Sequence, residues 1–220
     1  MKASVLALAL AAGLGVAGAA AAQDYSPLQA GHVTLDVRAT VVDPVAGNPI
    51  LDSTNTQVGG LNAEVGSYTI PSLGIRYFFT DNVSGELILG TSRHNIRAVN
   101  GGTNLDVGRT WVLPPTATVQ YNFNPHGRIN PYVGAGVNYM LFYSERSGPA
   151  FANTNVRNGF GWALQAGADV AVGGRWSVNL DLKKIFFRTT ATTTLLPGTA
   201  LHSRVRLDPW VPSVGIGYRF

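Results

Sequence analysis

Apolar residues recur at every second position along most of this chain. In the C-terminal segment the apolar set is Trp210, Pro212, Val214, Ile216, Tyr218 and Phe220, and the residues between them are Val211, Ser213, Gly215, Gly217 and Arg219. A period of two is that of a β-strand, whose successive side chains point to opposite faces. The segment is therefore predicted to be a strand with one apolar face and one face that is mostly polar or small.

The same alternation predicts seven further strands. Their apolar positions fall within residues 33–41, 73–79, 83–89, 111–123, 133–141, 162–170 and 176–182. Short connections at 80–82, 124–130 and 173–175 alternate with longer ones such as 43–66. This arrangement is typical of an outer-membrane barrel, with short periplasmic turns and longer extracellular loops. The predicted fold class is all-β, an eight-stranded antiparallel transmembrane β-barrel.

The distribution of charge indicates which face points outward. A soluble eight-stranded barrel such as a lipocalin also alternates, but we expect its apolar face inside and its charges outside. Here the apolar face has essentially no charge in mid-strand. Aromatic residues lie at the strand ends, as the two interfacial girdles of a membrane barrel require. They are Tyr77, Phe79, Tyr121, Phe123 and Phe220 toward one end, and Trp111, Tyr139 and Trp162 toward the other.

Residues 1–22 have a different character. Lys2 precedes a run of apolar residues that ends in Ala20, Ala21 and Ala22, as in a secretory signal peptide with its cleavage site. Its removal leaves one transmembrane barrel domain, 23–220, and lowers the net charge from +4 to +3 because Lys2 is lost. The predicted location is the outer membrane of a Gram-negative bacterium. Export and the absence of a basic run exclude nucleic acid as a partner, and the absence of cysteine excludes disulfides and thiolate sites.

Four motifs carry a resemblance to a known family. They are Leu113-Pro114-Pro115; Asn130 to Gly136 with Asn138 and Tyr139; Gly161 to Gln165 with Gly167 and Asp169; and Asp208-Pro209-Trp210 ahead of Gly215 to Phe220. In this order and spacing the sequence resembles the OmpW family of small outer-membrane β-barrel proteins over essentially its whole mature length. The resemblance implies an eight-stranded barrel that takes small hydrophobic molecules across or into the outer membrane.

The inward face predicts a plugged lower lumen. Its eight charges sum to zero: Asp36, Glu86, Asp169 and Asp181 against Arg38, Arg76, Lys183 and Arg219. An eight-stranded barrel is only wide enough for side chains to fill it. We therefore expect ion pairs in the periplasmic half, joined by the amides of Gln120, Asn138, Gln165 and Asn179, and no continuous water pore.

Toward the extracellular end the inward positions become apolar, which predicts a pocket for a small hydrophobic ligand. They are Ile88, Val112, Met140, Phe142, Ile185, Phe187, Leu207 and Val211. A side exit between strands is predicted at Pro71, Pro114, Pro115 and Pro209, with Pro212 nearby, because proline lacks the N–H of a ladder hydrogen bond. The alternative is that the apolar residues are ordinary core and the prolines only bend the strands. Lys183 stands where the family pattern has an aromatic residue. It would either pair with the neighbours of Asp181 or narrow and polarise this route.

Further partners follow from the surface. The extracellular third holds the whole mature charge excess in Arg93, Arg97, Arg109, Arg146, Arg157, Lys184, Arg188, Arg204 and Arg206 against Asp43, Asp52, Glu64, Asp106, Glu145 and Asp208. These bases are expected to meet the phosphates of lipopolysaccharide, unless they are simply solvated loop residues. Lys184, near the upper interface, is expected to snorkel toward the headgroups. Val214, Ile216, Tyr218 and Phe220 resemble the C-terminal signal read by the barrel insertion machinery. The expected state is a monomer.

An enzyme is a weaker interpretation. Ser92 and His94 form an inward pair near the outer rim, but no acid in the sequence pattern orients the histidine. His94 and His202 are two potential metal ligands, which do not define a site. The sequence therefore predicts no catalytic residues, no metal and no cofactor. The main functional alternative to uptake is a structural or surface-interaction barrel without transport.

Overall fold

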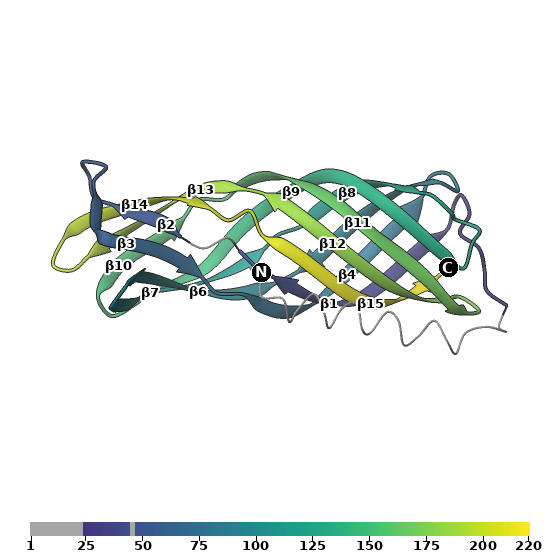
Figure 1. The fold of residues 1–220 in the computed structure, drawn as a ribbon, viewed down its shortest axis with the longest axis horizontal. Coiled ribbons are helices and arrows are strands. Elements are labelled where there is room, and N and C mark those ends of the chain that lie inside the picture. The colour runs from purple at the N-terminus through teal and green to yellow at the C-terminus, as the bar shows by residue number, and fades with distance from the viewer. Residues whose placement is uncertain (1–23, 45–46) are drawn as a thin grey trace.

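The computed structural model describes residues 24–44 and 47–220, so the predicted signal peptide lies outside the described residues. They form one 15-stranded sheet (Figure 1). The strands are β1 Val33–Val42, β2 Asn48–Leu51, β3 Gln57–Val65, β4 Tyr68–Phe78, β5 Val83–Gly90, β6 Ser92–Asn100, β7 Thr103–Leu113, β8 Thr116–Asn122, β9 Ile129–Ser147, β10 Phe151–Val156, β11 Gly159–Gly173, β12 Trp176–Phe186, β13 Arg188–Leu195, β14 Thr199–Arg206 and β15 Trp210–Arg219. No helix in this part of the chain is long and apolar enough to cross a membrane.

Eight of these strands close into an antiparallel barrel. The ring runs β1, β4, β5, β8, β9, β11, β12 and β15 and returns to β1. Val37 of β1 lies opposite Leu73 of β4 on one side and opposite Ile216 of β15 on the other, which closes the ring. The predicted eight-stranded barrel is confirmed.

Side chains alternate between the two faces of this ring. In β1 the side chain of Asp36 is 1% exposed, whereas that of Val37 is 64% exposed. Exposed aromatic pairs mark both ends of the outer face: Tyr121 contacts Phe123 at 5.2 Å between ring centroids, and Trp111 stacks on Tyr143 at 6.3 Å. The apolar face is thus the outer one, as the charge pattern predicts.

The long connections between ring strands, which the apolar alternation predicts as loops, contain strands. They form strands β2, β3, β6, β7, β10, β13 and β14, which with the upper part of β9 extend the wall beyond the ring (Figure 1). The extension has its own apolar core, which includes Ile50, Ala98 and Phe151. Strands such as β13, with its sequence RTTATTTL, carry threonine on both faces. Such strands show no apolar alternation in the sequence. Their position and register are therefore determined by the strands with which they pair.

The predicted strand 111–123 is in fact two strands. β7 ends at Leu113 and β8 begins at Thr116, because Pro114 and Pro115 have no N–H to continue a ladder. β7 pairs with β6 in the extension, whereas β8 belongs to the ring.

The chain before β1 closes the periplasmic end, which the sequence did not indicate. Tyr25 forms a bridge with Gly174, and the N–H of Leu28 donates to the carbonyl of Pro125 at 2.9 Å. The Leu28 side chain is 1% exposed, so it is sealed within this end of the molecule.

Candidate functional site

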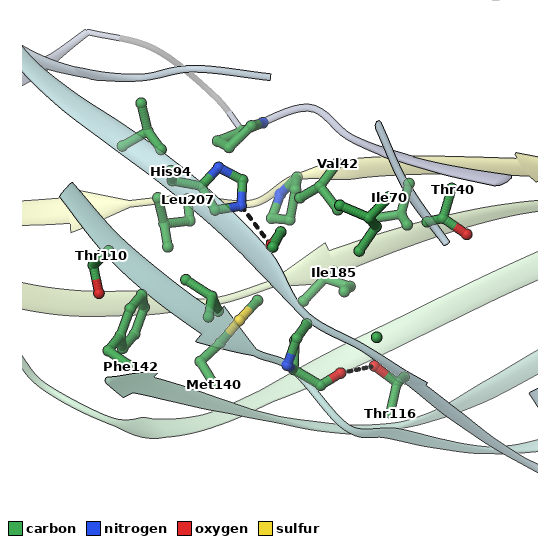
Figure 2. A pocket seen from close by; sticks show the side chains of 18 of the residues that line it. Thr40, Val42, Ile70, His94, Thr110, Thr116, Met140, Phe142, Ile185 and Leu207 are labelled. Carbon is green, nitrogen blue, oxygen red and sulfur yellow. Dashed lines mark hydrogen bonds between the residues drawn. The ribbon is translucent and has the colours of Figure 1, made fainter. Parts of the chain in front are cut away.

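An apolar cavity lies where the ring meets the extension. It has a volume of about 100 Å³, and Figure 2 shows Met140, Phe142, Ile185 and Leu207 on its wall. Met140 and Phe142 lie on β9 and Ile185 on β12, at inward positions, and Leu207 lies in the segment before β15. The lining of the cavity is therefore mostly apolar.

Seven of the eight residues predicted for this pocket line the cavity. They are Ile88, Val112, Met140, Phe142, Ile185, Leu207 and Val211. Phe187 is buried behind the wall and packs against Phe142 with ring centroids 6.1 Å apart. The structure adds Val42, Val65, Ile70, Val156 and Val205. Three of these five lie on extension strands, which the apolar pattern did not detect.

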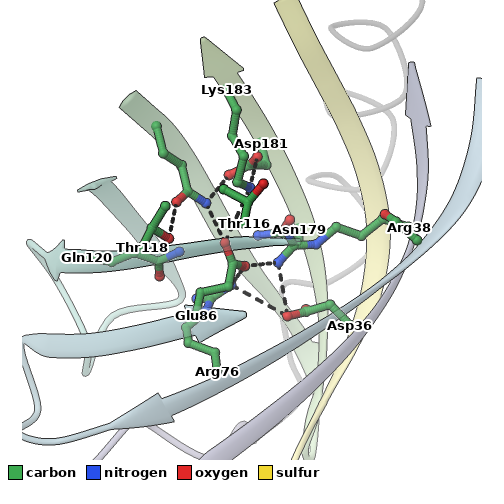
Figure 3. A network of polar contacts seen from close by, with 12 residues as sticks. Asp36, Arg38, Arg76, Glu86, Thr116, Thr118, Gln120, Asn179, Asp181 and Lys183 are labelled. Atoms are coloured by element: carbon green, nitrogen blue, oxygen red, sulfur yellow. Dashed lines mark hydrogen bonds and ion pairs between the residues drawn. The ribbon is translucent and has the colours of Figure 1, made fainter. Parts of the chain in front are cut away.

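The floor of the cavity is the top of a buried ion-pair network (Figure 3). Arg38 Nη2 donates to Glu86 Oε1 at 2.5 Å and to Asp36 Oδ2 at 3.1 Å. Lys183 Nζ lies 2.5 Å from Asp181 Oδ1 and 3.3 Å from Glu86 Oε2. The Lys183 ammonium thus forms ion pairs with two carboxylates of the cavity floor.

Neutral side chains complete this network. Gln165 Nε2 donates to Glu86 Oε2 at 2.8 Å, and Thr118 donates to Gln165 Oε1 at 2.8 Å. The hydroxyl of Tyr132 donates to Asp181 Oδ2 at 2.8 Å. Sequence reasoning missed Tyr132 as an interior residue, although it shares the inward phase of Asn130 in β9.

Deeper in the barrel the network continues around Arg76. Arg76 Nη1 donates to Asp169, and the guanidinium lies 5.0 Å from the centre of the Tyr132 ring. Asn179 Nδ2 donates to Asp169 Oδ1 at 2.8 Å. Charges buried in a narrow lumen are costly unless paired and hydrogen-bonded, and these contacts supply the pairing.

Three residues predicted for this network make other contacts. Arg219 is buried, but its Nη1 donates to the carbonyl of Ser26, and no acid pairs with it among the described residues. Asn138 Nδ2 donates to the carbonyls of Pro114 and Pro115 at 3.1 and 3.3 Å. Gln120 accepts from Ser84. Inward phase identifies the face of these residues but not their depth or partner.

The wall of the cavity has two interruptions in its strand pairing. Pairing of β5 with β8 ends at Ile88 and Thr116, and pairing of β6 with β7 begins at Ser92 and Val112. Within the described part of the chain no ladder pair joins residues 89–91 to 113–115, which include both prolines of the motif. On the other side of the same segment, pairing of β4 with β5 ends at Ser72 and Gly90, next to Pro71.

Pro209 does not lie at such an interruption. Its carbonyl accepts from the N–H of Ile185 at 3.1 Å, and Trp210 pairs with Lys184 directly beside it. The ladder beside Pro209 is therefore partly kept, and an exit at this proline stays a prediction.

Ser92 and His94 also face the cavity. Ser92 Oγ lies 2.8 Å from His94 Nε2, and His94 Nδ1 lies 3.0 Å from the carbonyl of Gly66. Burial lowers the pKa of His94, which stands on β6 beyond the ring. Neither contact of the imidazole in the described structure is a carboxylate, so the pair lacks the charged partner of a hydrolase triad.

At the rim of the ring Lys184 is held against the strands. Its Nζ donates to the carbonyl of Asp208 and lies 4.7 Å from the centre of the Trp210 ring. This position differs from the predicted snorkelling, because a backbone carbonyl already accepts from the ammonium. Arg206 forms an ion pair with the carboxylate of Asp208.

The proposed assembly residues lie on or just after the last strand. Ile216 and Phe220 are each 58% exposed on the outer face, and the N–H of Phe220 donates to the carbonyl of Val33 at 2.9 Å. Val214 and Tyr218 share the same phase of β15 and are half-buried.

The closed ring, its apolar outer face and its two aromatic girdles define a transmembrane β-barrel of the Gram-negative outer membrane. A family model described as the OmpW family matches residues 29–220. The chain belongs to the OmpW family.

Several similar proteins carry outer-membrane names. The chain is 40% identical to outer-membrane protein y4mB of Sinorhizobium fredii, covering 96% of this chain and 94% of that one. It is 32% identical to outer membrane protein W of Escherichia coli, covering 74% and 80%. It is 28% identical to the dibenzothiophene metabolism operon protein PahQ of Pseudomonas aeruginosa, covering 74% and 77%. The crystal structure of OprG from P. aeruginosa matches with a TM-score of 0.82 and 25% identity, covering 90% of this chain and 99% of that one.

Proposed function

We propose that this barrel takes up small hydrophobic molecules through its apolar cavity and releases them sideways into the outer membrane. The observation that carries the proposal is the contrast within one lumen: an apolar cavity stands directly on a buried ion-pair network. Such a floor stops an apolar solute, because the solute cannot replace the hydrogen bonds and ion pairs below it.

The interrupted strand pairing supports the lateral route. Residues 89–91 and 113–115 border the cavity without a ladder between them, and Gly90 and Pro114 line it. An opening here needs no ladder hydrogen bonds to break. The name of PahQ, which refers to dibenzothiophene metabolism, supports a hydrophobic cargo by similarity.

Uptake of a small hydrophobic compound by intact cells tests the cavity. Met140→Asp places a carboxylate on its wall, so uptake is expected to fall toward that of cells without the protein. Thr103→Asp adds the same charge at an exposed position in the extension and is the matched control. Heat modifiability in the outer-membrane fraction verifies that each variant is inserted. Equal uptake by wild type, Met140→Asp and cells lacking the protein would contradict the proposal and favour the structural or surface-interaction alternative.

The other proposed partners follow from the same architecture. Each of the eight ring strands pairs with two neighbours, which supports a monomer. Lipid surrounds its apolar outer face. We propose no catalytic role, because the Ser92–His94 pair lacks an acid, and no cofactor takes part in the proposed uptake.

A further inference from the structure

Four exposed arginines gather around one hollow on the extension. Arg93 and Arg97 lie on β6, Arg109 on β7 and Arg146 on β9, and all four line an open hollow of about 640 Å³. We call it the arginine hollow. Asp106 is the single acid that lines it, so its lining carries a net charge of +3. Within the described residues no carboxylate lies within 4.0 Å of any of these four guanidinium groups.

Two of these arginines face each other directly. Arg109 and Arg146 are cross-strand partners in the β7–β9 ladder. Like charges in this position destabilise a sheet unless an anion lies between them. Arg188 and Arg206 are also directly opposed, but there the carboxylate of Asp208 accepts from Arg206. Among the described residues the Arg109–Arg146 pair has no such acid, so the protein leaves this pair of charges uncompensated.

Glycines shape this hollow. A Cβ on Gly108 would lie 2.2 Å from the carbonyl oxygen of Arg146, and one on Gly148 would lie 2.0 Å from that of Asp106. The register of β7 on β9 also shifts between Arg109 and Trp111. At these glycines β7 and β9 approach each other with no side chain between them. This close approach leaves a recess between the arginine side chains.

The depth of the hollow points to a membrane lipid. Trp111 lies two residues from Arg109 along β7, roughly 7 Å at the rise of a strand. It stacks on Tyr143 in the extracellular aromatic girdle, and Arg93 is its cross-strand partner. The arginines thus lie just beyond the level of the acyl chains, at the height of phosphates attached to a lipid headgroup.

We propose that the arginine hollow binds the phosphates of one lipopolysaccharide headgroup, while the acyl chains of this lipid pack against Trp111 and Tyr143. Guanidinium groups suit this ligand because they form paired, charge-assisted hydrogen bonds with phosphate oxygens. The site is separate from the apolar cavity and does not depend on the uptake proposal.

Lipid binding by the folded protein in detergent tests this proposal. Arg109→Gln with Arg146→Gln removes the opposed charges, and Arg157→Gln with Arg204→Gln removes two exposed arginines of the extension outside the hollow. Native mass spectrometry measures binding of bisphosphorylated lipid A, of dephosphorylated lipid A, and of inorganic phosphate as a competitor. Heat modifiability shows that each variant is folded.

The expected result is a loss of affinity for bisphosphorylated lipid A of about tenfold or more in the hollow variant, with wild-type affinity in the control variant. Dephosphorylated lipid A is expected to bind the wild-type protein weakly, with the affinity that the hollow variant has for bisphosphorylated lipid A. Millimolar inorganic phosphate is expected not to displace bisphosphorylated lipid A from the wild-type protein. Equal affinity of wild type and the hollow variant would overturn the proposal. Binding of inorganic phosphate without preference for the lipid would overturn the assignment to lipopolysaccharide, as would an equal loss in both variants.

Discussion

Glu86 contacts several partners in the buried network rather than one. Its carboxylate accepts from Arg38 and Gln165 and lies 3.3 Å from Lys183 Nζ, and its side chain is 1% exposed. Removal of a partner from a buried network leaves charges that cannot be hydrated.

The first prediction therefore concerns stability. Glu86→Ala is expected to lower the free energy of unfolding by about 3 to 5 kcal/mol, because Arg38 and Lys183 lose a carboxylate in a dry lumen. Denaturant unfolding in detergent measures the change. Glu64→Ala, at an exposed acid of β3, is the control and is expected to leave stability within about 0.5 kcal/mol of wild type. An unchanged midpoint for Glu86→Ala would mean that the network adds no stability.

His94 gives the cavity wall a dependence on pH. Burial lowers the pKa of this imidazole, so the folded protein binds its proton less readily than the unfolded chain. The contribution of neutral His94 to stability is complete above the unfolded pKa of about 6.5, and it is lost as the pH falls through the folded pKa.

The second prediction is that His94→Gln reduces the loss of stability on acidification. Unfolding midpoints in detergent between pH 7.5 and pH 5 measure this slope. His202→Gln, on β14 outside the cavity, is the matched control for the substitution. The same slope in wild type and in both variants would contradict the prediction.

At the scale of the strand, the chain breaks between β7, which pairs with β6, and β8, which pairs with β5. Pro114 and Pro115 occupy this break, and Asn138 satisfies their carbonyls from the neighbouring β9. Valine at both positions would restore two N–H groups opposite residues 89–91.

The third prediction is that Pro114→Val with Pro115→Val reduces uptake of the hydrophobic compound severalfold without making the cavity more polar. Restored ladder hydrogen bonds would close the interruption. Pro131→Val, in β9 at the periplasmic end, is the control. Wild-type uptake by the double variant would exclude this interruption as the exit.

The fourth prediction concerns the assembly signal proposed for the last strand. Deletion of Phe220 is expected to leave the chain exported but poorly inserted, because the exposed apolar end of β15 is the proposed signal for the insertion machinery. Heat-modifiable, protease-resistant protein in the outer-membrane fraction measures insertion. A normal amount of this form in the deletion variant would contradict the proposed signal.

At the scale of the whole molecule, the lumen is blocked at two levels. The ion-pair network fills its middle, and Leu28 with the chain before β1 closes the periplasmic end. Side chains of the described residues therefore pack the lumen at both levels, as expected for a barrel of eight strands.

The fifth prediction is a very low ion conductance in planar bilayers. Wild type and Met140→Asp are expected to conduct equally little, because ions are stopped below the cavity. Bilayers that receive detergent alone provide the baseline. Stable steps of porin-like size from the wild-type protein would show that the network opens.

The sequence by itself determined the barrel and its orientation in lipid. A period of two together with an uncharged apolar face is enough to place Asp36 inside and Val37 outside. The reason is that only one face of each membrane strand contacts lipid, and that face must be apolar. Phase also identified the inward residues of the cavity, including Met140 and Ile185.

Only the tertiary structure decided depth, partners and the extension. Arg219 and Arg38 share the inward phase, yet one contacts the chain before β1 and the other the central carboxylates. Strands such as β13 are held by their neighbours rather than by their own apolar pattern. Likewise, Arg109 and Arg146 lie 37 positions apart in the numbering and meet only through the register of β7 on β9. Periodicity is a local property of the chain, whereas depth and pairing depend on which distant strands come together.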